Sequence, residues 1–257
     1  MPTRDTPWPT GTPCWVDLGA PDVEAARAFY TAVLGWSYTG GEPEYGGYVT
    51  GQVGGRAAAG IGPQQNPSDP PRWTTYFAAE DADAVAGRIT EAGGTLVVPP
   101  MDVGPMGRMA IALDPQGNPF GLWQGGLNTG VQVYNEPGAL VWNEAAVDDP
   151  AGAREFYAAV FGFTYAEVPG ADGYTTFATA DRPLGGLGGR AEGGPTGWAT
   201  CFAVPSTNAA LEAVVSGGGA VTVPAVDTEF GRFAVVTDPW GAAFSVMQEP
   251  AGEGART

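Results

Sequence analysis

Hydrophobic positions that follow Asp22 recur with the spacing of an α-helix. Phe29, Val33 and Leu34 fall on one face, at positions i, i+4 and i+5, and alanines occupy much of the remainder. Asp22 has the side chain of a helix N-cap, and Gly35 is the kind of residue at which a helix ends. The pattern therefore predicts a short amphipathic helix whose apolar face packs against a sheet.

The second half of the chain repeats this pattern. Arg27 and Arg154 each precede a Phe-Tyr pair by two residues, and the offset of 127 between them holds closely to the end of the chain. Self-similarity over this length indicates two copies of one domain. We predict that Tyr30 and Tyr157 pack in the cores of these copies and have no catalytic role. Further matched positions are Trp15 with Trp142, Trp73 with Trp198, Gly107-Arg108 with Gly231-Arg232, Asp114-Pro115 with Asp238-Pro239, and Gln124 with Gln248.

Short apolar runs bounded by Gly and Pro predict strands around each helix. Each copy is expected to contain two units of one strand, one helix and three further strands, which gives four βαβββ units and an α+β fold. We place the first domain at residues 11–125, a linker at 126–137 and the second domain at 138–249. Expected strands are Thr12–Leu18, Trp36–Thr39, Tyr45–Gly51, Arg56–Gly62, Trp73–Ala79, Thr95–Val98, Gly107–Leu113, Pro119–Gln124, Ala139–Ala145 and Trp198–Val204, and expected helices are Asp22–Leu34, Asp81–Ala92, Pro150–Phe161 and Ser206–Ser216.

The segment Leu184–Gly194 is rich in glycine, and we expect it to be a turn region. It contains the letters Gly-x-Gly-x-x-Ala of a dinucleotide-binding motif. The residues that follow do not open a helix that could hold a pyrophosphate, so we reject this motif and interpret it as a strand end and a turn.

Charge and composition exclude several functions. Eleven Lys plus Arg against 28 Asp plus Glu leave a net charge of −17, which would repel nucleic acid and anionic membranes. The chain has no His, and all its basic residues are Arg, so it offers no imidazole base and no Schiff-base lysine. Cys14 and Cys201 are not equivalent in the two copies, which argues against a disulfide framework or a cysteine zinc site. No apolar run of membrane length is present, and we expect a cytoplasmic protein.

The paired βαβββ units, the Phe-Tyr helix and the Asp-Pro-x-Gly turn before a last strand together resemble the vicinal oxygen chelate superfamily. This superfamily includes glyoxalase I, extradiol dioxygenases and the bleomycin and fosfomycin resistance proteins. The segments Gly11–Leu18, Gly121–Gln124 and Trp142–Glu144 more closely resemble the tandem glyoxalase-like proteins of actinobacteria. The resemblance implies two glyoxalase-like domains, each with a mixed sheet curled around a concave pocket.

In the superfamily, metal ligands come from the first strand of each unit and from a carboxylate on the last strand. The resemblance places Trp, Thr, Ala, Gly or Ser at these positions, and none of them is a competent ligand for a transition metal. We therefore expect neither a metal nor another cofactor. The positions are Trp15, Thr74 and Gly121 in the first copy, and Trp142, Ala199 and Ser245 in the second.

Asp17 and Glu144 are the candidate catalytic residues. Strand alternation puts Asp17 on the face of Trp15, and Glu144 on the face of Trp142. A carboxylate beside an indole in a poorly hydrated pocket should have a raised pKa, as a general base near neutral pH requires. The other reading is that the tryptophans fill cores and the acids cap local backbone. Further candidates for ligand binding are Trp73, Trp123, Trp198 and Met247, together with Arg108 and Arg232, which alternatively pair with Asp102 and Asp227.

Aromatic walls with few polar groups suit a flat organic ligand. We expect a metal-independent protein that binds an aromatic or polyketide-like small molecule, with acid–base tailoring chemistry in secondary metabolism. Two alternatives remain: a non-catalytic protein that binds a drug or biosynthetic intermediate for self-resistance, and a glyoxalase-like detoxification lyase. The sequence leaves open whether the protein is a monomer or a homodimer, which pocket is active, and whether units pair within or between the halves.

Overall fold

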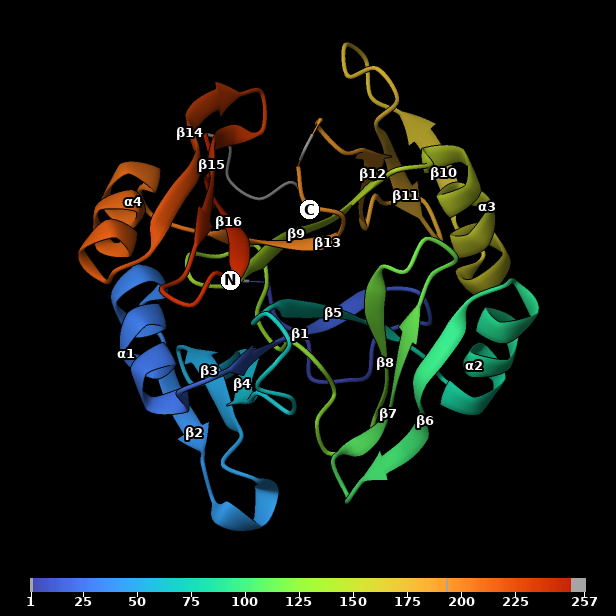
Figure 1. Cartoon of the computed structure of the whole chain (residues 1–257), viewed down its shortest axis with the longest axis horizontal. Helices are drawn as coiled ribbons and strands as arrows, with labels where there is room; N and C mark the ends of the chain where they lie inside the picture. The colour runs from blue at the N-terminus through green and yellow to red at the C-terminus, as the bar shows by residue number, and fades with distance from the viewer. Residues whose placement is uncertain (1, 193, 251–257) are drawn as a thin grey trace.

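The structure is a computed structural model that describes residues 2–192 and 194–250. It contains two eight-stranded mixed sheets, one from each copy of the repeat (Figure 1). The first sheet has the order β2-β3-β4-β1-β5-β8-β7-β6, and the second has the order β10-β11-β12-β9-β13-β16-β15-β14. The first contains β1 (Pro13–Ala20), β2 (Ser37–Gly40), β3 (Val49–Val53), β4 (Arg56–Pro63), β5 (Trp73–Ala78), β6 (Thr95–Val103), β7 (Gly107–Leu113) and β8 (Pro119–Gly125). The second contains β9 (Leu140–Val147), β10 (Thr164–Glu167), β11 (Thr175–Ala178), β12 (Gly185–Gly189), β13 (Gly197–Ala203), β14 (Ala220–Thr228), β15 (Gly231–Thr237) and β16 (Ala243–Gln248).

The units pair within each half of the chain. β1 runs antiparallel to β5 at the centre of the first sheet, and each of these strands has the last strand of its own unit, β4 or β8, as a parallel neighbour. β9 and β13 form the same centre in the second sheet. The predicted α+β fold of four βαβββ units in two curled sheets is confirmed.

Two local predictions were wrong in extent. The glycine-rich segment Leu184–Gly194, expected to be a turn region with a strand end, contains the strand β12 over Gly185–Gly189. Its glycines are compatible with a strand because a tyrosine ring lies against their backbone, as described below. In the first copy, residues Pro43–Tyr45 form a 3-10 turn, and β3 begins only at Val49.

Four helices cover the sheets, and their ends follow the sequence signals. Asp22 caps the first helix by accepting a hydrogen bond from the Ala25 amide at 3.0 Å, and Gly35 ends it in the left-handed conformation at φ 73°. Asp149 and Gly162 have the same roles in the third helix. The helices are α1 (Val23–Leu34), α2 (Ala82–Glu91), α3 (Pro150–Phe161) and α4 (Thr207–Ser216).

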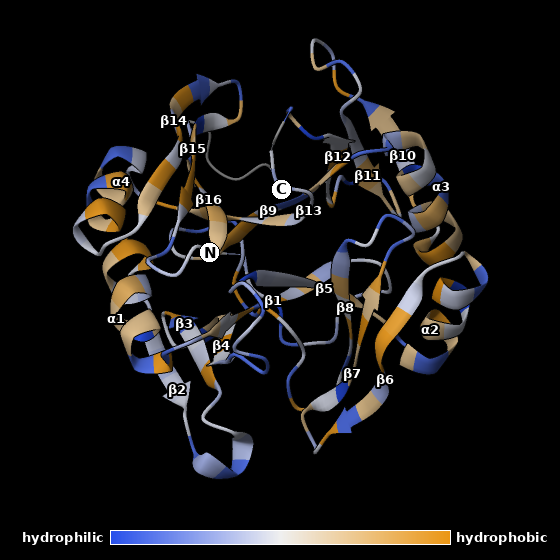
Figure 2. Ribbon diagram, viewed as in Figure 1, coloured by the Kyte–Doolittle hydropathy of each residue, from blue (hydrophilic) through white to orange (hydrophobic). Residues whose placement is uncertain are grey.

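The hydrophobic cores combine residues of both halves. α1 lies beside α4 on one flank of the molecule, and α2 lies beside α3 on the other (Figure 1). One core cluster joins the first unit of the chain to the fourth, and a second cluster joins the second unit to the third. Apolar residues follow the helices and the strands that they cover, while hydrophilic residues dominate the outer loops (Figure 2). Each half therefore depends on the other for burial of its helices.

Hydrogen bonds connect the halves inside these cores. Tyr30 on α1 is fully buried and donates to Asp238 of the second half at 3.1 Å, while the indole of Trp73 donates to the Tyr30 hydroxyl at 3.1 Å. Tyr157 on α3 donates to Asp114 of the first half at 3.2 Å. The predicted core role of the two tyrosines is confirmed. Their partners are the aspartates of the repeated Asp-Pro-x-Gly turns.

No helix in residues 2–192 and 194–250 has the length and apolar character needed to span a bilayer.

We predict that residues 1–125 alone do not form a folded monomer, because separation of the halves would expose both core clusters. Sedimentation velocity and near-UV circular dichroism should show an unfolded or self-associated chain. Co-expression with residues 126–257 should restore a folded heterodimer. A monomeric first half that unfolds cooperatively would contradict the shared cores.

Candidate functional site

Four polar or aromatic side chains meet on the concave face of the first sheet. The indole of Trp15 donates to the Tyr48 hydroxyl at 2.9 Å, and this hydroxyl donates to the Asp17 carboxyl group at 3.3 Å. Tyr76 on the neighbouring strand β5 also interacts with the Asp17 carboxyl group and lowers its pKa. The structure thus brings Trp15 and Asp17 together, as strand alternation predicted, and adds two phenols that the sequence analysis did not identify.

Glycines of β4 make room for Tyr48. A Cβ atom at Gly60 would overlap the Tyr48 hydroxyl, and one at Gly62 would press against the ring at 2.8 Å. The ring therefore lies on bare backbone, with its hydroxyl held above the start of β1. A side chain at either glycine would displace it from Asp17.

The second sheet holds the same array. The indole of Trp142 donates to the Tyr174 hydroxyl at 3.0 Å, and Tyr174 donates to Glu144 at 2.9 Å. Gly186 and Gly188 of β12 leave the space for the Tyr174 ring. The glycines of the rejected dinucleotide motif thus form the surface on which a pocket tyrosine lies.

Burial shifts the titration of both acids. It raises the pKa of Asp17 from 3.8 to about 7, while hydrogen bonds from Tyr76 and Tyr48 oppose the shift. Burial also raises the pKa of Glu144, and the hydrogen bond from Tyr174 opposes this shift. Both carboxyl groups are therefore adapted to exchange protons closer to neutral pH than an exposed acid is.

The chain itself covers the first concave face. In the linker, the Val131 amide donates to the Cys14 carbonyl at 2.7 Å, and Val131 is 1% exposed. Trp8 of the N-terminal segment donates its indole N–H to the Val131 carbonyl at 3.1 Å and packs on the same apolar cluster. Trp15 and Trp123 are only 3% and 8% exposed under this cover.

The second concave face is more open. Trp142 and Met247 are partly exposed, whereas the corresponding Trp15 and Trp123 are buried; Tyr174 and its counterpart Tyr48 are both partly exposed. Strand register places an apolar wall beside Met247, because residues paired across strands point to one face. The other residues of this wall are Val223, Val226, Phe233 and Val235.

Trp73 and Trp198 lie on the opposite, helix-covered faces of the sheets. Trp73 pairs with Leu18, and Trp198 pairs with Ala145, both residues of the cores. The two indoles hydrogen-bond the core tyrosines and do not line the pockets. This corrects the prediction that they bind ligand. The residues next to them, Thr74 and Ala199, are the ones that pair with Asp17 and Glu144 of the concave faces.

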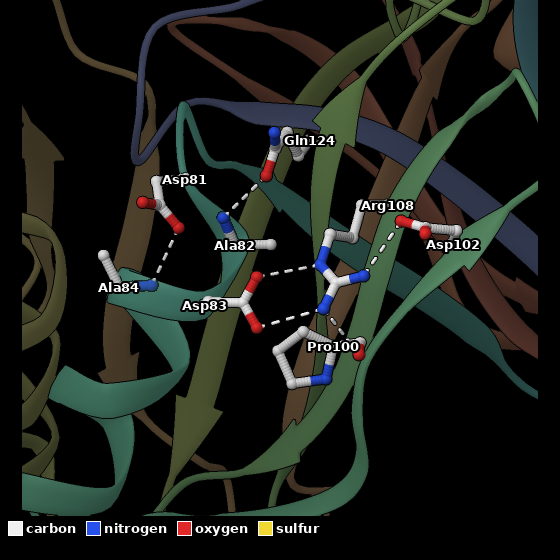
Figure 3. A network of polar contacts seen from close by, with 8 residues as sticks. All are labelled: Asp81, Ala82, Asp83, Ala84, Pro100, Asp102, Arg108 and Gln124. Carbon is white, nitrogen blue, oxygen red and sulfur yellow. Dashed lines mark hydrogen bonds and ion pairs between the residues drawn. The ribbon is translucent and has the colours of Figure 1, made fainter.

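Arg108 also lies outside the concave face. Its guanidinium binds both carboxylate oxygens of Asp83 on α2, at 2.9 and 3.0 Å, and Asp102 on β6 at 2.9 Å (Figure 3). This hydrogen bonding holds the pKa of Asp83 below its usual range. Arg108 thus connects a helix to a hairpin, as the alternative interpretation proposed, and is not placed to clamp a ligand.

Arg232 has the corresponding position in the second copy. It binds Asp227 at 2.9 Å and the side chain of Asn208 on α4 at 3.1 Å. As with Arg108, these side chains already pair with the positive charge of the guanidinium, so Arg232 is not available to bind a ligand.

The side chains at the centre of each sheet do not fit a transition metal. Residues 2–192 and 194–250 contain no group of three or more His, Cys, Asp or Glu that could hold one. In each sheet, one row of side chains crosses the three central strands. The two rows together contain a single good metal-binding atom, the Cys201 sulfur. Burial raises the pKa of that thiol and so disfavours the thiolate that binds a metal. The rows are Trp15, Tyr76 and Gly121 in the first sheet, and Trp142, Cys201 and Ser245 in the second.

A surface hollow of about 340 Å³ lies away from these arrays, between the connector after β4 and the turn at Trp240. Its lining contains neither of the candidate acids, and prolines form much of it. We therefore assign it no part in the site.

Sequence reasoning missed Tyr76 on β5 and the matched pair Tyr48 and Tyr174. The signal was present, because Gly47-Tyr48 and Gly173-Tyr174 match at an offset of 126. Both lie in loops before a strand, where periodicity does not indicate which way a side chain points.

The sequence model of the Glyoxalase/Bleomycin resistance protein/Dioxygenase superfamily matches residues 14–122 and 139–246. The chain belongs to this superfamily. Its two glyoxalase-like domains are the two copies of the repeat.

Curated relatives in the superfamily span nearly the whole chain. The putative glyoxylase CFP32 of Mycobacterium tuberculosis is 38% identical in an alignment of 257 residues. The alignment covers 96% of this chain and 98% of the relative. The anthracycline biosynthesis protein DnrV of Streptomyces peucetius is 38% identical over 260 residues, which cover 93% of each protein.

Solved structures share the fold at much lower sequence identity. The Mn(II)-bound glyoxalase from Novosphingobium aromaticivorans has a TM-score of 0.67 at 15% identity, covering 94% of this chain and 83% of that one. A catechol 2,3-dioxygenase has a TM-score of 0.62 at 16% identity, covering 96% of this chain and 92% of that one. These likenesses concern the fold alone.

The raised pKa of Asp17 predicts a pH-dependent effect of Asp17→Asn on stability. The folded protein keeps the Asp17 proton up to about pH 7, whereas the unfolded chain releases it near the ordinary value of 3.8. The unfolded state therefore binds fewer protons in this window, and the wild type loses stability as the pH rises through it. Thermal melts should show the variant gaining stability relative to the wild type from pH 4 to pH 8. A difference that is constant with pH would contradict the shift, and Asp22→Asn, which changes an exposed helix cap, provides the control.

Proposed function

We propose that this protein binds a neutral, flat aromatic small molecule on the concave face of its second sheet, without a metal ion. The observation that carries the proposal is the different exposure of two matched arrays. The Trp–Tyr–acid array of the first sheet lies under the linker and Trp8, where Trp15 and Trp123 are buried, whereas their counterparts Trp142 and Met247 in the second sheet are partly exposed. Aromatic and apolar walls with one convergent acid suit such a ligand.

The relatives and the charge support this choice of ligand. A relative named as an anthracycline biosynthesis protein supports a place in secondary metabolism and an aromatic or polyketide-like ligand. A net charge of −17 disfavours an anionic ligand. A glyoxalase reaction is less well supported, because a metal-activated enediolate needs ligands that the central rows do not supply.

The binding proposal predicts one site per chain for the neutral aromatic dye prodan. Its emission should shift to the blue on binding, with saturation at one equivalent. Trp142→Ala should weaken binding by about tenfold or more, in keeping with the loss of about 1.4 kcal/mol or more of contact with a large aromatic side chain. Trp15→Phe, in the covered array, is the matched control and should leave the affinity unchanged. Two sites per chain, or no effect of Trp142→Ala, would contradict the proposal.

Acid–base chemistry is a second candidate, favoured by the hydrogen bond of Tyr174 to Glu144. In this reaction Glu144 removes a proton from a carbon next to a ligand carbonyl. The C–H electron pair forms a carbon–carbon double bond, and the carbonyl π pair moves to oxygen, which gives an enolate. Tyr174 holds the carboxylate in place, and the partly apolar pocket raises its basicity.

For this candidate we predict accelerated deuterium exchange of the α-protons of 2-tetralone in D2O, measured by NMR above the buffer rate. The enzymatic rate should rise with pH through the raised pKa of Glu144, because the ionised form is the base. Glu144→Gln should reduce the rate to background, whereas Asp17→Asn should retain it. Exchange at the buffer rate in the wild type would contradict the acid–base candidate and would leave the proposal of non-catalytic binding standing.

A further inference from the structure

One of the differences between the two concave faces lies in a row of side chains beside the acid. Tyr76 and Gly121 lie next to each other on β5 and β8 in the first sheet, and Cys201 and Ser245 take their places on β13 and β16. Both positions change together, which points to a change in what occupies the space next to the carboxyl group.

In the first sheet, this space holds a phenol that belongs to the chain. Tyr76 interacts with the Asp17 carboxyl group and lowers its pKa, and Asp17 also accepts a hydrogen bond from Tyr48. The Tyr76 ring lies over Gly121, where any Cβ atom would overlap it. Two internal phenols therefore satisfy the carboxyl group of Asp17.

In the second sheet, that phenol is missing. Cys201 is far smaller than tyrosine, and its thiol lies close enough to Glu144 for their charges to interact. Ser245 carries the Cβ atom that would obstruct a tyrosine ring at Cys201. Within the part of the chain that the structure describes, Glu144 accepts one hydrogen bond, from Tyr174 to its Oε2 atom.

We infer that the ligand supplies the missing phenol: an aromatic hydroxyl of the ligand donates a hydrogen bond to the Oε1 atom of Glu144, in the place that Tyr76 fills in the first domain. This inference rests on the proposed binding function and narrows the ligand to hydroxylated aromatics. Cys201 and Ser245 take the positions of Tyr76 and Gly121 there, and the two residues are 5% and 4% exposed. A hydroxyl is favoured over an acidic group because the acceptor is a carboxylate in a protein of strongly negative charge.

The test compares 2-naphthol with 2-methoxynaphthalene, which has the same ring system but no donor. Competition against prodan should show the wild type binding 2-naphthol about tenfold more tightly, as a hydrogen bond to a charged acceptor allows. Glu144→Leu should remove this preference while keeping the affinity for 2-methoxynaphthalene. Cys201→Tyr with Ser245→Gly should rebuild the arrangement of the first domain and block both naphthalenes.

The reverse exchange in the first domain, Tyr76→Cys with Gly121→Ser, is the matched control and should leave the preference of the second domain unchanged. Near-UV circular dichroism and melting temperature establish whether each variant folds. If a double variant does not fold, the Glu144→Leu result alone tests whether the ligand hydroxyl binds Glu144. Equal affinity for the two naphthalenes in the wild type would overturn the inference and leave the proposed function standing. If neither binds, or the Cys201→Tyr, Ser245→Gly variant still binds both, the proposed site itself is wrong.

Discussion

Two hydrogen bonds between halves of the chain determine the rest of the structure: Tyr30 to Asp238 and Tyr157 to Asp114. Each joins the first helix of one copy to the last turn of the other copy inside the core, where the aspartate also accepts hydrogen bonds from amides of its own turn. A buried phenol left without an acceptor there would cost about 1–3 kcal/mol, so each half selects the position of the other. The helices pack in the cores that the two halves share, so the concave faces of the sheets are the surfaces left for function.

This arrangement explains why similar arrays have different environments. The fold duplicates the Trp–Tyr–acid geometry, because glycines in β4 and β12 and the register of the central strands recur in both copies. The covering is not duplicated: Trp8 and Val131 come from segments before and between the repeats. One array is therefore enclosed by sequence that lies outside the repeat, and the binding proposal concerns the other.

The sequence was sufficient for the repeat, the four βαβββ units, the helix caps and the pairing of Trp15 with Asp17. It was insufficient to predict to which face of the sheet a side chain points. Trp73 and Thr74 alternate on one strand, and only the pairing of Trp73 with Leu18 shows that the indole points to the core. Tyr48 reaches its place through a loop of 3-10 and turn residues, whose path depends on the glycine surface of β4 and not on local periodicity.

The shared cores have a consequence for how the two sites can differ. Folding of one half against the other is the geometry of a symmetric dimer of half-chains, here joined by a linker. In a dimer of identical chains, every substitution acts at both sites at once, so a phenol introduced to fill one pocket would also close the other. Covalent joining removes this constraint. One chain can hold Tyr76 over Gly121 at one end and Cys201 beside Ser245 at the other, with an internal occupant in the first place and room for an external one in the second.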